Sequence, residues 1–348
     1  MRPGSDVLRE VWQDARKQAC RGLVGHALTS SLPLGPKTQD MVQQTMLTVA
    51  WPNLKLNHLL AESVKVLREG GIEPVLLKGQ GVASYYKDPL LRESGDIDFY
   101  VGPEAYREAY LLLDSLSEDK SENEFEPFSK HSHVTVDGMT IEVHRYCEVL
   151  MAKYDPRFQE YALKGLTEGL RSVEIEGTPV TVPETTFNAF FIFNHIWRHF
   201  IVLGCGFRQI CDWTALLHAE AGNLDLDYLG RILGDLNLMR PWQVFGAIAV
   251  RKLGLPESEM PFFDPKAERH IRKVIGLIMK EGNFGHEREE INVRPSNYLV
   301  WKAKSLGIST KRYLSLYPAF GSIALEEYRW RVFNGFGTAG KDLKAKIE

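Results

Sequence analysis

Apolar residues recur every three to four positions over the first 70 residues and over most of the chain after residue 150. This spacing predicts amphipathic helices. A helical stretch begins near residue 5 and ends at a polar break over 30–36, and a long helix follows over 37–68 until Gly70-Gly71 ends it. Later in the chain the pattern predicts helices over 183–203, 207–220, 226–237, 240–253, 265–281 and 295–306.

Between these helical parts the pattern changes to short apolar runs that are typical of strands. Residues 74–77 and 97–101 are expected strands, joined by a glycine turn, a short helix over 82–87 and a break at Asp88-Pro89. A helix over 103–116 follows, and two hairpins are expected around Asp137-Gly138 and Gly177. We therefore expect an α+β fold, with a small mixed β-sheet, N-terminal helices and a C-terminal helical region.

The chain has 348 residues, which suits two domains, or one domain with a large helical extension. We divide it into an N-terminal helical region (1–71), an α/β core (72–148), a helical C-terminal domain (149–336) and a flexible tail (337–348).

A net charge of −3 does not favour nucleic acid as a partner. The sequence has neither an 18-residue apolar run nor a signal-peptide core, so we expect no membrane contact and a cytoplasmic location. Four scattered cysteines without CxxC spacing indicate reduced thiols rather than a zinc site.

Asp96 and Asp98 lie two residues apart in an apolar run, directly after Gly95. On a strand, positions i and i+2 point to the same face, roughly 6.6–7 Å apart. Like charges side by side on a buried face repel each other, so a divalent cation, Mg²⁺ or Mn²⁺, is expected between them. This hypothesis requires both carboxylates to project from one face of the strand into an open cavity.

The turn Lys78-Gly79-Gln80 precedes this strand. Glycine allows a backbone to approach phosphate oxygens closely, and a lysine beside it can neutralise a triphosphate. Arg92, four residues before Asp96, has two interpretations that the sequence leaves open. It binds phosphate, or it pairs with Asp96 or Glu93.

These residues resemble the nucleotidyltransferase superfamily that includes DNA polymerase β, and most of all its bacterial branch called nucleotidyltransferase family 5. The matching residues are Leu77-Lys78-Gly79, Tyr86, Pro89, Arg92 and Gly95-Asp96-Ile97-Asp98. The turn Gly79-Gln80 departs from the Gly-Ser or Gly-Gly of the superfamily. The resemblance implies a third carboxylate on a neighbouring strand, and Glu142, with His144 on the same face, fits this position. The nucleotide-binding residues it implies are Lys78, Gly79, Gln80, Arg92, Gly95 and Arg208.

A second group of polar residues lies on the later helices. His195 and His199 share one helical face, but Ile196 replaces the glutamate of a zinc-protease motif, so metal binding here is disfavoured. The resemblance suggests that His195, Arg198 and His199 face the cleft. Arg208 and Asp212 are four residues apart, which predicts an ion pair that orients Arg208 toward phosphate or substrate. A structural polar network between helices remains the alternative. The basic and aromatic stretch 301–317 is interpreted as a solvated helix rather than an RNA contact.

The function implied by the resemblance is transfer of a nucleoside monophosphate from a nucleoside triphosphate, such as ATP, to an acceptor hydroxyl, with release of pyrophosphate. Asp96, Asp98 and Glu142 are the expected catalytic and metal-binding residues. Two alternatives remain, a nucleotide-binding module without turnover and a tailoring transferase that acts on a peptide or a sugar. The sequence identifies neither the acceptor nor the preferred base.

Overall fold

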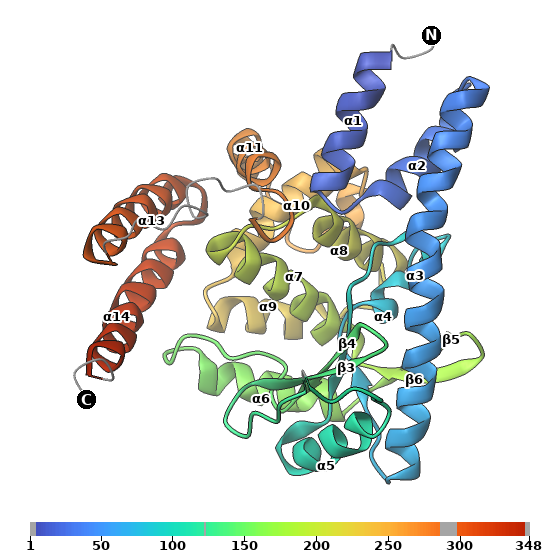
Figure 1. Ribbon diagram of the computed structural model, residues 1–348. Helices are drawn as coiled ribbons and strands as arrows, with labels where there is room; N and C mark the ends of the chain where they lie inside the picture. Colours follow the sequence, from blue (N-terminus) through green and yellow to red (C-terminus); the bar gives the residue numbers. More distant parts are fainter. Residues whose placement is uncertain (1–4, 122, 286–297, 345–348) are drawn as a thin grey trace.

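The computed structural model describes residues 5–121, 123–285 and 298–344. It confirms the α+β class: one mixed β-sheet lies between the long helix α3 and a body of C-terminal helices (Figure 1). The strands are β1 (Val75–Leu76), β2 (Asp96–Tyr100), β3 (His131–Val136), β4 (Met139–His144), β5 (Arg171–Ile175) and β6 (Thr178–Val182). The helices are α1 (Ser5–Lys17), α2 (Arg21–Ser31), α3 (Pro36–Glu69), α4 (Gln80–Ala83), α5 (Gly102–Asp114), α6 (Asp155–Thr167), α7 (Thr185–Val202), α8 (Phe207–Ala219), α9 (Leu226–Asp235), α10 (Met239–Leu253), α11 (Ile271–Glu281), α13 (Tyr298–Phe320) and α14 (Ser322–Lys344).

The observed helices differ from the predicted ones mainly at their ends. The first helical stretch is split into α1 and α2, and the short helix after the glycine turn begins at Gln80 instead of residue 82. Helix α13 is much longer than the predicted helix 295–306, whose first three residues lie outside the described part of the chain. Helix α14 continues to Lys344, into the predicted flexible tail.

The six strands are ordered β3-β4-β2-β1-β6-β5. Strand β2 runs parallel to β4 and antiparallel to β1, and β1 runs parallel to β6. Both predicted hairpins are present, and their turns Asp137-Gly138 and Glu176-Gly177 have positive φ at both residues, as type I′ turns require. The sheet therefore includes strands from both sides of the expected boundary at residue 148, while the domain division itself stays a prediction.

The two faces of strands β2, β3 and β4 differ completely in chemistry. One face is apolar and packs against α3 and α5; it carries Ile97, Phe99, Val134, Val136, Ile141 and Val143. Successive residues on a strand point to opposite faces, so the residues between these project from the other face. That second face carries Asp96, Asp98, His131, His133, Glu142 and His144.

Helix α7 is the centre of a second apolar core, built with the C-terminal helices. It is buried on almost every side, through Phe187, Phe190, Phe193, Trp197 and Phe200. The side chain of Glu184 caps its first turn by accepting hydrogen bonds from two backbone amides. None of the helices in the described residues is long and apolar enough to cross a membrane.

Candidate active site

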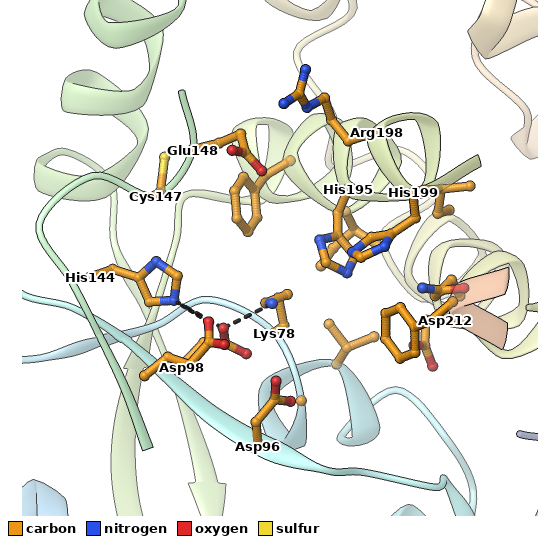
Figure 2. Close-up of a pocket in the computed structure, with 18 of the residues that line it drawn as sticks. Lys78, Asp96, Asp98, His144, Cys147, Glu148, His195, Arg198, His199 and Asp212 are labelled. Carbon is orange, nitrogen blue, oxygen red and sulfur yellow. Dashed lines mark hydrogen bonds and ion pairs between the residues drawn. The ribbon is translucent and has the colours of Figure 1, made fainter. Parts of the chain in front are cut away.

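A cavity of about 380 Å³ lies between the polar face of the sheet and helices α7 and α8 (Figure 2). Of the predicted site residues, all within the described part of the chain, only Gln80 and Gly95 do not line it. Gln80 is buried and donates a hydrogen bond to Asn53 on α3, and Gly95 lies exposed in the loop before β2. Gly79 does line it, with φ at +60° and a backbone so close to Asp96 that a Cβ would lie 3.3 Å from the Asp96 carbonyl oxygen.

Asp98 is the most buried acid of the site, with 1% of its surface exposed. Its Oδ1 accepts from Lys78 Nζ at 2.8 Å and is 3.0 Å from His144 Nε2. Its Oδ2 is buried and has no hydrogen-bond partner in the described structure. Burial alone would raise the pKa of Asp98, but Lys78 and His144 hold this pKa well below its usual range.

Asp96 projects from the same face of β2 as Asp98 and is only partly buried. The carboxylate of Asp96 makes no hydrogen bond or ion pair with another described residue. The negative charge of Asp98, and then burial, raise the pKa of Asp96, and Lys78 only partly offsets them. An unpaired carboxylate beside a carboxylate with one orphaned oxygen is a donor set that suits a hard divalent cation.

Glu142 lies directly opposite Asp98 in the parallel pair of β2 and β4. The buried His144 bridges the two acids, with Nε2 at 3.0 Å from Asp98 and 3.1 Å from Glu142. Burial would lower the pKa of His144, but the two carboxylates raise it above its usual value. The contact with His144 also lowers the pKa of Glu142, although burial alone would raise it. A third carboxylate therefore lies on the strand next to Asp98, and His144 contacts both acids.

Lys78 lines the cavity together with Asp96, Asp98 and Glu142, and its side chain does not fill the cavity. Although burial favours the neutral amine, the charges of Asp98, Asp96 and Glu142 raise the pKa of Lys78, so it stays protonated. Its ammonium group contacts one oxygen of Asp98, which leaves the other oxygen of Asp98 and the carboxylate of Asp96 unpaired.

The side chain of Arg92 pairs with neither Asp96 nor Glu93, and it connects the loop before β2 to helix α8. Its Nε and Nη2 donate to the two carboxylate oxygens of Asp212 on α8, at 2.9 and 2.8 Å. The Tyr86 hydroxyl donates to the same carboxylate at 2.9 Å. The expected pair between Asp212 and Arg208 is therefore absent, because the planar guanidinium of Arg92 takes both oxygens.

Arg208 lies close to the acids instead. Its Nη1 donates to the Glu93 carbonyl oxygen at 2.5 Å, and its buried Nε has no partner in the described residues. The pKa of Arg208 is lowered, because burial and the charge of the nearby Arg92 outweigh the charges of Asp212 and Asp96, which raise it. A buried cation with an unused donor at the wall of a cavity is suited to bind an anion.

The helix α7 forms the opposite wall. The rings of His195 and His199 lie edge to face, with centroids 4.2 Å apart. Burial, and then the charge of Lys78, lower the pKa of both, that of His199 to about 4. Arg198 projects away from the two histidines (Figure 2), and its Nη1 lies 3.8 Å from Glu327 on α14.

Two ionisable residues that line the cavity, Glu148 and His131, were not predicted from the sequence. Glu148 lines the cavity, and Lys130, 3.6 Å away, holds its pKa below the usual value although burial would raise it. His131 also lines the cavity. The His-Ser-His alternation at the start of β3 could have revealed His131, because it places two imidazoles on the face of Glu142. Glu148 lies in an irregular segment and carries no such signal.

A mixed sheet that presents a pair of acids and a third acid on the next strand to a cavity is the arrangement expected of a nucleotidyltransferase. Residues 7–254 match the family described as "Uncharacterised nucleotidyltransferase", and the chain belongs to this family. The chain is similar to a solved structure, the antigenic nucleotidyltransferase-like protein from Paracoccidioides brasiliensis, with 14% identity and a TM-score of 0.30 over 53% of this chain and 88% of the other. No curated protein matches it.

Proposed function

We propose that this protein transfers a nucleoside monophosphate from a nucleoside triphosphate to an acceptor hydroxyl and releases pyrophosphate. The observation that carries this proposal is the position of Asp96 and Asp98. Both project from one face of β2 into the cavity, and each keeps carboxylate oxygens that no described residue pairs. The cavity volume of about 380 Å³ lies in the range of small-ligand sites.

Asp96 and Asp98 would hold Mg²⁺ or Mn²⁺, which when bound offsets the charge of the triphosphate and of the leaving pyrophosphate. Lys78 and Arg208, two cations that line the cavity, orient the phosphates. Gly79 allows the backbone to approach a phosphate oxygen, since it carries no Cβ.

Glu142 orients the acceptor hydroxyl and takes its proton. The hydroxyl oxygen then forms the new bond to the α-phosphorus while the bond to the pyrophosphate oxygen breaks. His144 holds Glu142 in place through the bond to its Oε2. Most of the rate enhancement is expected from alignment and charge stabilisation.

The test is incubation of the purified protein with each triphosphate, labelled at the α-phosphate, together with Mg²⁺ or Mn²⁺ and a cell extract. Wild type should form a product whose mass is increased by one nucleotide. Asp96→Asn should reduce this product by at least about 1,000-fold, since one acid of the cation site is lost. Glu108→Gln, an exposed acid on α5, is the matched control and should act as wild type.

Label at the γ-phosphate separates the alternatives. Transfer of the γ-label identifies a phosphotransferase, and binding of nucleotide without any product identifies a module without turnover. A sugar or peptide adduct that lacks a nucleotide identifies a different tailoring reaction. Each of these three results contradicts the proposal. Because a net charge of −3 does not favour nucleic acid, we expect a small molecule or a peptide as acceptor. The expected location is the cytoplasm.

A further inference from the structure

Two histidines extend the polar face of the sheet beyond the proposed catalytic acids. In the antiparallel pair of β3 and β4, His133 lies opposite Glu142 and His131 lies opposite His144. Residues at alternate positions share a face, so all four side chains project toward the cavity side of the sheet. His131, His133 and Glu142 each offer one ligand atom, and these atoms all lie within 4.8 Å of one another.

The distances in this cluster are too long for hydrogen bonds. His131 Nδ1 is 3.8 Å from Glu142 Oε2, and His133 Nδ1 is 3.8 Å from Glu142 Oε1. The Nδ1 atom of His131 is buried and has no hydrogen-bond partner in the described structure. A charge-assisted pair would close to about 2.7–2.9 Å, so the carboxylate does not satisfy either imidazole.

The spacing suits a metal ion instead. Nitrogen and oxygen ligands about 2.0–2.2 Å from a tetrahedral Zn²⁺ lie about 3.4 Å from one another. The two observed separations of 3.8 Å are slightly longer, so small side-chain rotations would bring the ligand atoms to this spacing. His144 contacts Oε2 of Glu142 at 3.1 Å, the same oxygen that His131 faces, and fixes the orientation of the carboxylate.

We propose that His131, His133 and Glu142 form a second cation site, for a borderline transition-metal dication of the Zn²⁺ class. Imidazole nitrogen favours such ions over Mg²⁺, which prefers oxygen ligands. Three protein ligands leave a fourth coordination position open for water or an oxygen of a substrate, and two of them, His131 and Glu142, line the cavity. Glu142 is shared with the proposed catalytic acids, but the metal site does not depend on nucleotidyl transfer.

The experiment uses the full chain after EDTA treatment and dialysis, without nucleotide. Zn²⁺ is titrated calorimetrically in millimolar Mg²⁺, which saturates oxygen-only sites. Wild type should bind one Zn²⁺, and His133→Ala should weaken the binding on the order of 100-fold or more. Half of the His133 side chain is exposed, so the variant should fold, and its unfolding midpoint is measured to verify this.

Two control variants complete the test. His58→Ala removes an exposed histidine on α3 and should leave Zn²⁺ binding unchanged. Asp96→Asn should abolish nucleotidyl transfer but keep Zn²⁺ binding, which separates failure of this proposal from failure of the proposed function. The absorption spectrum of bound Co²⁺ should change in His131→Ala and His133→Ala. Absence of Zn²⁺ binding in wild type, or wild-type affinity in His133→Ala, would overturn the proposal.

Discussion

The two walls of the cavity contain the same residue type, histidine, with pKa values shifted in opposite directions. On the sheet wall, His144 lies between Asp98 and Glu142, and these carboxylates raise its pKa although it is fully buried. On the helix wall, His195 and His199 are buried without a carboxylate in contact, and their pKa values are lowered.

The difference shows that burial alone does not set the charge of an imidazole. Burial disfavours the charged form on both walls, and only a hydrogen-bonded carboxylate reverses this effect. The sheet wall therefore holds a compact network of charges, with Lys78 and His144 against three acids. On the helix wall the imidazoles of His195 and His199 offer aromatic surfaces, which suit contact with a base, beside the cations Arg198 and Arg208.

The largest effect is expected from Asp98→Ala, which removes the acceptor shared by Lys78 and His144. Two buried cations then lack their main partner, and loss of one member of a buried ion pair costs about 3–5 kcal/mol. The free energy of unfolding, measured by urea denaturation at neutral pH, should fall by this amount.

Asp96→Ala on the same strand is the matched control for this measurement. Asp96 has no partner in the described structure, and repulsion from Asp98 raises its pKa. Its removal should leave the free energy of unfolding within about 0.5 kcal/mol of wild type, or increase it. If both alanine variants unfold alike, the charge network of the sheet wall does not stabilise the fold.

A second prediction compares the histidine walls directly by NMR titration of the metal-free protein. His144 should titrate above 6.5, the usual value for histidine, and His199 at about 4. Glu142→Gln should lower the pKa of His144, because one of its two carboxylate partners is lost, and leave that of His199 unchanged. A pKa of His199 near 6.5 would contradict the burial of this ring.

The smallest expected effect is the contribution of His199 to the pH dependence of stability. Its pKa is about 4 in the folded state and about 6.5 in the unfolded state, so only the unfolded state binds the proton in between. Stability is therefore lost as the pH falls from about 6.5 to about 4. His199→Gln should lose less stability than wild type between about pH 7.5 and about pH 5 in urea denaturation. Equal losses in both proteins would show that His199 does not contribute.

The local elements of the core were predictable because short-range patterns define them. The strand with Asp96 and Asp98, the turn at Gly79 and both hairpins follow from apolar alternation and glycine positions. The pairing of Asp212 was not predictable in this way. Arg208 lies one helical turn before Asp212, but the loop before β2 brings Arg92 to the carboxylate of Asp212. Asn53 on α3 holds this loop, because its side chain donates to the Leu90 and Arg92 carbonyl oxygens.

The sequence by itself determined which side chains share a face of a strand, because the two-residue period of a strand is a local property of the backbone. Only the tertiary structure decided that Glu142 lies opposite Asp98, that Lys78 and His144 hold that acid, and that His131 and His133 approach Glu142. The reason is that the order and register of strands, and the burial that sets each pKa, depend on contacts between residues far apart in the chain.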